Sequence, residues 1–432
     1  MIGFPKQVKD FKSHFYKNKA WEKSFNKKRE AYLNSSQLIE DKTKDWRFFP
    51  FHKILSSEFD FNSKCIEIEN LKAQLKDSIV IQIKNGDIVS YENEKFQVVS
   101  WTDFLEGKKQ LPSSFTDKIF KSFNQQRNHL SCLNHIFYPR GFILIFKKAI
   151  RSAVEIHYLQ DSLASKQALN LRNFIFIEKS ARVLEFFHTR KSQKPLFLNI
   201  QTDCFLKEKT SLEYFAFDNM KEQDTIVHQM FSYLKKESKA SFLNLSLNVG
   251  LSRWFKYVEQ EEKSESKLRG LSLMSGKSHT DHKTTVKHKG LRGQSEQFFK
   301  SFLFDSARYV FQGLISIEKT ADESETKQLN KNYLFSSKSS ALSFPELDVC
   351  PANVKAEHGS TTSSFFERNP LLFYLKSRGI DSFLSFHLVL LSLLKETFSD
   401  CSKDMQSLIH KYLERQLALL EESLNQDKKN EK

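Results

Sequence analysis

The chain has 432 residues, of which 39% are hydrophobic and 28% charged, and 67 Lys and Arg residues against 52 Asp and Glu residues give it a net charge of +15. This length exceeds one ordinary globular core and predicts two or three domains, unless the fold is elongated or repetitive. The composition is that of a folded protein and argues against a disordered chain. The first residues carry charges where a secretory leader is apolar, and the longest apolar stretch, Phe383–Leu394, is too short to span a bilayer. We therefore expect a cytoplasmic protein.

The first part of the chain, residues 1–138, predicts a helical region with one small β element. Five apolar side chains near its start share one helical stripe: Phe4, Val8, Phe11, Phe15 and Trp21. Further on, Ile79–Ile83, the pair Asn85-Gly86 and Ile88-Val89 predict a strand, a tight turn and a second strand.

From residue 139 to residue 365 the pattern predicts short strands. The clearest are Phe142–Phe146, Val154–Tyr158, Phe174–Ile177, Val183–Phe187, Leu196–Ile200, Leu212–Phe217, Phe242–Val249, Trp254–Val258 and Leu271–Met274. No long helical pattern separates them, which disfavours a doubly wound α/β fold. Roughly fifteen strands in one run favour a β-solenoid over a sandwich, although the sequence shows no strict period.

The last part, residues 366–432, predicts helices again. A first apolar stripe contains Leu371, Leu372, Leu375, Phe383, Phe386, Leu390, Leu394 and Phe398. A second helix, from about Lys403 to Leu424, has the stripe Met405, Ile409, Leu413, Leu417, Leu420 and Leu424.

The cysteines give no local metal motif. Cys65, Cys132, Cys204, Cys350 and Cys401 are all widely separated, so zinc and ferredoxin spacings are absent. Any iron–sulfur cluster that this chain contacts is therefore shared with a partner or ligated across the fold.

Three other segments invite a chemical interpretation. Gly270–Ser278 resembles a phosphate-binding loop but has five residues between its glycines instead of four, so a turn of the solenoid is favoured. The histidines His279, His282 and His288 lack a completing set of ligands, and we expect structural roles for them. Glu357 and His358 point to opposite faces if they lie on a strand, so they do not act on one atom together.

The positive charge is spread along the chain and accompanies no nucleic-acid motif. Solvated basic faces are the favoured interpretation, and nucleic-acid binding is the weaker one.

A hundred-residue segment contains, in chain order, Asp281-His-Lys-Thr-Thr-Val-Lys-His288, Ser295-Glu-Gln297, Lys300 and Ser306-Ala-Arg308. These elements resemble the motifs of the SufB/SufD family of iron–sulfur cluster assembly. They continue with Gln328-Leu-Asn330, Pro345-Glu-Leu347, Val354-Lys355-Ala-Glu-His358-Gly359 and Phe373-Tyr374-Leu375-Lys-Ser377-Arg378-Gly379-Ile380. Asp45-Trp46-Arg47 is similar to an element near the start of the family's proteins.

Within this family, His358-Gly359 resembles the SufD branch, since the SufB branch has a Glu after this His and a cysteine on a neighbouring strand. Ala356 stands where many SufD proteins have a cysteine, and Asp381-Ser382 replaces the family's Ala-Arg pair.

The resemblance implies a mainly β fold, a right-handed parallel β-helix flanked by N-terminal and C-terminal helical regions. It implies pairing with SufB through the β-helix, docking of the SufC ATPase on the C-terminal helices, and a homodimer as a further state when SufB is absent. The chain itself is then no enzyme and holds no stable cofactor, although His358 contributes to transient iron or cluster binding at the SufB interface. The docking candidates are Phe373, Tyr374, Leu375, Arg378, Leu390 and Leu394.

Three alternatives stay open at this stage. A SufB-like scaffold is disfavoured by His358-Gly359 and the missing cysteine. A carbohydrate-active β-helix would present clustered carboxylates on one face, and a basic nucleic-acid-binding solenoid would show salt-dependent binding of random DNA.

Overall fold

The computed structural model describes residues 71–88, 91–92, 94–124, 140–160, 167–188, 194–247, 250–364 and 370–430, with isolated positions at 23, 27, 46, 48–50, 54, 59, 130–131 and 134. All five residues of the helical stripe predicted near the start of the chain lie outside the described residues. Among the described helices, none has the length and apolar character that crossing a bilayer requires.

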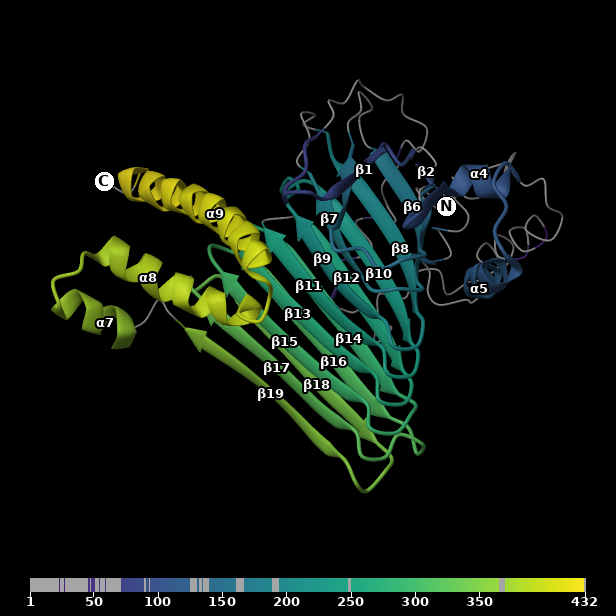
Figure 1. Cartoon of the computed structure of the whole chain (residues 1–432). Coiled ribbons are helices and arrows are strands. Elements are labelled where there is room, and N and C mark those ends of the chain that lie inside the picture. The colour runs from purple at the N-terminus through teal and green to yellow at the C-terminus, as the bar shows by residue number, and fades with distance from the viewer. Residues whose placement is uncertain are drawn as a thin grey trace.

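Two long, mostly parallel sheets face each other and form a β-solenoid (Figure 1). The first sheet contains β1 (Ile79–Lys84), β5 (Val154–Leu159), β7 (Ala181–Phe187), β9 (Ser211–Asp218), β11 (Lys239–Leu247), β13 (Glu265–Met274), β15 (Gln294–Leu303), β17 (Glu325–Leu334) and β19 (Lys355–Ser364), in that spatial order. The second contains β18 (Ser340–Val349), β16 (Arg308–Ile317), β14 (His279–His288), β12 (Leu251–Gln260), β10 (Thr225–Leu234), β8 (Leu196–Leu206), β6 (Gln167–Ile177), β4 (Phe142–Phe146), β3 (Phe96–Ser100) and β2 (Tyr91–Glu92). The chain alternates between the sheets, which confirms the predicted parallel β-helix.

The sequence has no strict period because the coils differ in length. Leu251 pairs with His279 and Arg308 pairs with Ser340, so the number of residues per coil varies. Three corners, at residues 207–210, 235–238 and 261–264, nevertheless share one design. Their third residue is left-handed, with φ of 58° at Lys209 and 53° at Lys263, and a closing Ser or Thr hydroxyl donates to the first carbonyl. At 235–238 and 261–264 the backbone N–H of the same serine also donates to this carbonyl, so the hydroxyl adds a second hydrogen bond that closes the turn.

The space between the sheets changes character along the solenoid. In the early coils the inward positions carry side chains such as Val154, Val183 and Tyr214, which are fully buried. In the last coils the same row continues with Gln297 and Gln328, and it ends at His358. The core is therefore hydrophobic at one end and polar at the other.

Helices cover the outer faces of both sheets. On the second sheet, α4 (Trp101–Leu105) and α5 (Ser113–Asn124) pack over β4 and β6 through a cluster that includes Trp101 and Phe174. On the first sheet, α8 (Ser382–Lys395), the 3-10 turn η1 (Glu396–Phe398) and α9 (Lys403–Asn430) bury a second apolar cluster. Of the predicted α9 stripe, Met405, Ile409, Leu413, Leu417 and Leu420 are all buried, as expected.

The strand–turn–strand predicted near residue 79 takes a different form. β1 pairs in parallel with β5, and only a single bridge, Lys84 to Asp87, closes the turn at Asn85-Gly86. Parallel pairing buries Ile83 completely in the interior of the solenoid, which an isolated hairpin would leave exposed. The first sheet therefore begins before residue 139, the predicted start of the β region.

We expect Leu413→Ala to lower the free energy of unfolding by about 2–5 kcal/mol, because it leaves a cavity between α9 and the first sheet. Urea unfolding followed by circular dichroism measures this loss. Leu388→Ala, at a side chain of α8 that is 43% exposed, is the matched control and should change stability little. Equal losses in both variants would contradict the packing of α9 described above.

Candidate functional site at the open end of the solenoid

The residues that carry the family resemblance mostly join one coil to the next. Asp281 pairs with Arg253 on the preceding coil and accepts a hydrogen bond of 3.3 Å from Gln312 on the following one. The Arg253 guanidinium lies 4.1 Å from the ring centre of Trp46, which ties the N-terminal Trp-Arg element to this contact. The Lys300 ammonium donates to the Leu393 carbonyl at 2.6 Å. Their roles are structural, and they explain the spacing of the motif without any chemistry.

The three histidines of β14 do not converge. His282 shares a hydrogen bond of 3.0 Å with the Tyr309 hydroxyl, and His288 one of 2.8 Å with the Ser295 hydroxyl. His279 lies on the other face of the strand, edge-on to the ring of Phe49. Burial lowers the pKa of His282 to about 3 and that of His288 to about 4, so both are neutral at pH 7.

The segment Gly270–Ser278 forms the end of β13 and a corner, as predicted. Gly276 has a φ of 62°, and Ser278 donates to the carbonyl of Ser275. Strand β14 follows directly, so the helix that a phosphate-binding loop requires is not there.

His358 lies on the last strand of the first sheet. Among the described strands, β19 pairs only with β17 and β18 pairs only with β16, so β19 and β18 form the last edges of the two sheets. His358 is exposed and stands in register with Gln328, whose buried amide atoms have no hydrogen-bond partner. The site therefore consists of an inward-facing imidazole over a polar interior, flanked by two strand edges.

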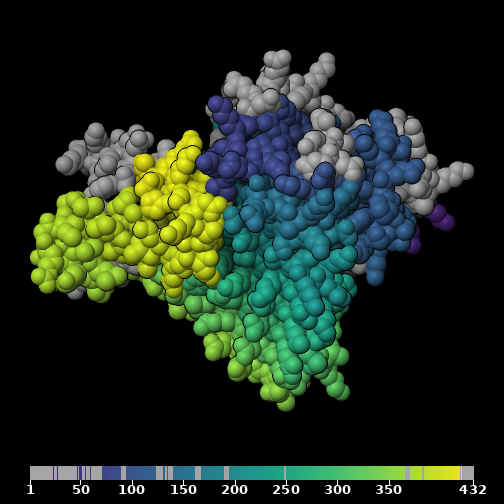
Figure 2. All heavy atoms as spheres, viewed as in Figure 1, coloured from purple at the N-terminus to yellow at the C-terminus, as the bar shows by residue number. Residues whose placement is uncertain are grey.

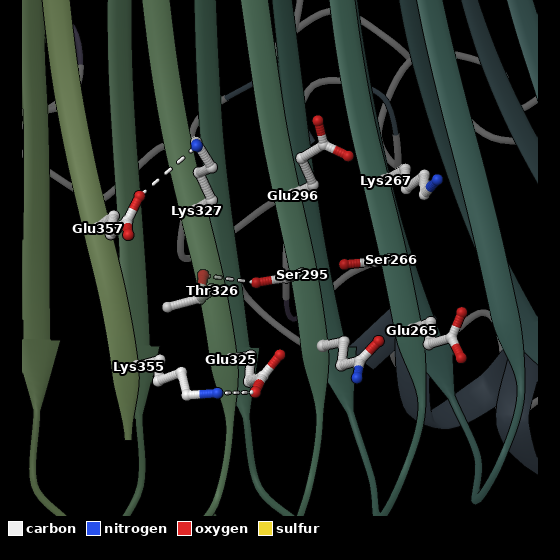
Figure 3. Close-up of a pocket in the computed structure, with 11 residues that line it drawn as sticks. Glu265, Ser266, Lys267, Ser295, Glu296, Glu325, Thr326, Lys327, Lys355 and Glu357 are labelled. Atoms are coloured by element: carbon white, nitrogen blue, oxygen red, sulfur yellow. Dashed lines mark hydrogen bonds and ion pairs between the residues drawn. The ribbon is translucent and has the colours of Figure 1, made fainter. Parts of the chain in front are cut away.

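Glu357 faces away from His358, as predicted. It lies on the outer face of the first sheet, where it pairs with Lys327 at 3.5 Å (Figure 3). A hollow of about 380 Å³ on this face is lined by charged side chains of β13, β15, β17 and β19. Figure 3 shows the pattern of pairing, with Lys355 reaching Glu325 at 2.7 Å on the neighbouring strand. Because its charges neutralise one another between strands, this hollow does not select a charged ligand.

A buried charged pair lies deeper in the solenoid and was not predicted. Burial raises the pKa of Glu185 to about 7, although the hydroxyls of Tyr158 and Tyr214 donate to its carboxylate. Burial lowers the pKa of Lys256 to about 7, and its ammonium has no hydrogen-bond partner. Each side chain is inward-facing on its strand, but no sequence pattern indicates that β7 and β12 bring them near one another.

The described cysteines differ in accessibility. Cys204 is fully buried, and burial raises the pKa of its thiol well above the ordinary range. Burial likewise raises the pKa of Cys401 to about 11. Cys350 is exposed just after β18, and the predictions for Cys65 and Cys132 lie outside the described residues.

The six docking candidates separate into two groups. Leu390 and Leu394 are 1% and 0% exposed and pack against the outer face of the first sheet, so the prediction that they contact a partner conflicts with their burial. The others belong to α7 (Pro370–Ser377) or follow it directly, and α7 buries none of its residues. Phe373 is 76% exposed and Tyr374 54%, and Arg378 lies 5.3 Å from the Tyr374 ring centre. Figure 2 shows α7 and α8 as a yellow-green projection from one side of the solenoid.

Comparison with known proteins agrees with this architecture. Residues 158–391 match the model of the SUF system FeS cluster assembly, SufBD core domain, over more than half of the chain. The chain belongs to the SufBD family. That family works in iron–sulfur cluster assembly, which confirms the resemblance found in the sequence.

Individual relatives are distant. An iron–sulfur cluster assembly SufBD family protein of Synechocystis is 28% identical over 204 residues, covering 46% of this chain and 44% of the relative. The iron–sulfur cluster assembly protein SufD of Plasmodium berghei is 26% identical over 290 residues, covering 66% of this chain and 19% of the relative. SufD of Escherichia coli is 28% identical over 120 residues, covering 28% of each chain. The chain thus spans less than half the length of each of these relatives.

We expect Lys256→Met to raise the free energy of unfolding by about 1–3 kcal/mol at pH 6, since it removes a buried ammonium without a hydrogen bond. In the unfolded chain Lys256 keeps its proton up to about pH 10.5, but in the folded chain only up to about pH 7. The cost of burying it is therefore full below pH 7 and disappears as the pH rises towards 10.5. Urea unfolding at pH 6 and pH 10 should show a smaller advantage at the higher pH. An advantage of equal size at both values, or one shared by the corner variant Lys277→Met, would contradict this account.

Proposed function

We propose that this chain is a SufD-type scaffold subunit of the SUF iron–sulfur cluster assembly complex. The observation that carries the proposal is the position of His358, inward-facing and exposed where both sheets end. The His358-Gly359 pair of the SufD branch and the two relatives named SufD support this branch of the family. The cytoplasmic location stays a prediction.

Pairing with SufB follows from the two open edges. No further strand of the described residues pairs with the outer sides of β18 and β19, and their side chains are half-buried or exposed. An edge strand of this kind is a template for a strand of another chain. We assign the edges of β18 and β19 to SufB, and to a second copy of this chain when SufB is absent.

His358 then lies within the interface and contacts the cargo of the complex. A neutral imidazole is a suitable ligand for ferrous iron or for one iron of a nascent cluster. The chain supplies only a single such group here, so binding is transient and shared with SufB. In this proposal the subunit is not an enzyme, and ATP hydrolysis belongs to SufC.

SufC docking is assigned to α7. Its exposed Leu371, Phe373 and Tyr374 form an apolar surface on an element that rests on α8 and not on the solenoid. Deleting everything after Arg378, a simple test on sequence grounds, would also remove α8 and α9 and expose the apolar outer face of the first sheet. Point substitutions in α7 are therefore the sharper test.

A SufB-like role is the second candidate, favoured only by Cys350. This thiol is exposed beside the end of β18 and within reach of a partner at that edge. If Cys350 receives sulfur, Cys350→Ser abolishes cluster formation, whereas a SufD-type subunit tolerates it.

We expect His358→Ala to leave the complex with SufB and SufC assembled but to lower its iron and sulfide content several-fold, because one ligand of the cargo is lost. Co-expression of the three proteins, followed by iron and sulfide analysis of the purified complex, measures this. Glu357→Ala, at the neighbouring position on the opposite face, is the control and should retain full content. Unchanged iron and sulfide content in the His358→Ala complex would contradict the role of His358 as a ligand.

We expect the double substitution Phe373→Asp and Tyr374→Asp to weaken capture of SufC at least tenfold, since aromatic anchors dominate most protein interfaces. Pull-down at several SufC concentrations gives the measurement, and the thermal unfolding midpoint should not move because both side chains are exposed. Leu291→Asp changes another exposed apolar residue, 45% exposed on a corner of the solenoid, and should leave SufC binding intact. Full SufC capture by the double variant would place the docking surface elsewhere.

A further inference from the structure

A second hollow lies between α5 and the outer face of the second sheet. Its volume is about 520 Å³, and side chains of α5, β8, β10, β12 and the corner after β14 line it. Four of these side chains are lysines and four are aromatic, with one carboxylate and one hydroxyl beside them. This composition differs from that of the hollow near β19, where every carboxylate pairs with a lysine or an arginine.

Stacked rings lead into the hollow along the sheet. Phe176 stacks on Phe205, and Phe205 stacks on Tyr233, each pair with ring centres 5.1 Å apart and planes 11° apart. The next residue in register is Glu259, so the stack ends at Tyr233, and both Phe205 and Tyr233 line the hollow. Tyr257 closes the other side, with its ring tilted at 59° to Tyr233 and its hydroxyl donating to Glu259. A flat ring placed on Tyr233 would extend the row by one more member.

The charge around the hollow is unbalanced. Lys289 pairs with Glu259 at 2.8 Å and Lys235 pairs with Glu261. No carboxylate among the described residues pairs with Lys118 or Lys121 of α5, and the Lys118 ammonium lies 5.7 Å from the Phe205 ring centre. Partial burial, and then the like charge of Lys235, lower the pKa of Lys118. Two cations thus lie beside an aromatic stack without an ion-pair partner among the described residues, although the charge of Glu178 acts on Lys118 from a distance.

We propose that this hollow binds a nucleoside phosphate, with the base stacked on Tyr233 and the phosphate held by Lys118 and Lys121. A stacking surface without charge would suit a neutral aromatic molecule, and lysines without rings would suit inorganic phosphate. The combination matches a ligand that carries both groups, because bases stack on aromatic side chains and phosphate attracts ammonium groups. The site lies on the opposite sheet from His358 and does not depend on the scaffold function.

Isothermal titration of the full chain with adenosine monophosphate tests the site. We expect saturable binding of the nucleotide, and binding at least tenfold weaker for adenosine and for inorganic phosphate, which each lack one half of the ligand. The double substitution Lys118→Ala and Lys121→Ala should weaken nucleotide binding about tenfold. The matched control removes two lysines that lie outside the hollow, Lys109→Ala with Lys277→Ala, and should bind as the unaltered chain does.

Tyr233 provides an independent arm of the experiment. Tyr233→Leu should weaken binding about tenfold through loss of stacking, whereas Tyr233→Phe keeps the ring and should bind normally. Circular dichroism of each variant verifies that the solenoid is folded. Equal affinity for nucleotide and inorganic phosphate, or insensitivity to both the lysine pair and Tyr233→Leu, would overturn the proposal. So would tight binding of a twelve-nucleotide oligothymidylate without binding of the mononucleotide, since it would identify the hollow as a polymer site.

Discussion

The parallel pairing of each coil with the next is the constraint on which the rest of this molecule depends. Because the strands are in register, a residue stands beside its equivalent in the neighbouring coil, and the side chains form rows along the solenoid. The ring stack Phe176–Phe205–Tyr233 and the row that ends at His358 are two products of the same geometry. One backbone arrangement thus sets the core, the ion pairs on the surface and the orientation of the candidate site.

Many of the strands could be predicted from the sequence, because apolar residues at every second position give a recognisable pattern. Phe142–Phe146 and Val154–Leu159 are apolar at every inward position, and their pattern is plain in the sequence. β14 is harder to identify, since its inward positions include Thr284 and His288, whose partners Gln297 and Ser295 lie on the next strand. Polar side chains that form hydrogen bonds across the interior, between the two sheets, resemble loop residues in the sequence.

For the candidate site, too, some features could be predicted from the sequence and others could not. Alternation along β19 correctly separated Glu357 from His358, because a strand exposes successive residues to opposite faces. The stripe containing Leu390 and Leu394 was assigned to a partner, yet it packs on the chain's own sheet, since an apolar stripe does not state which surface covers it. The lysines of α5 were not noticed because the rings beside them come from strands about a hundred residues further along the chain.

The two open strand edges also bear on how the protein is handled by a cell. A β-helix can add coils at an uncapped end with no change in geometry, so β18 and β19 are equally suited to a correct partner and to another exposed edge. Synthesis in excess of the partner would leave these edges uncovered and favour end-to-end association of copies. If SufB covers these edges as we propose, balanced production of the two proteins would therefore protect the chain from aggregation.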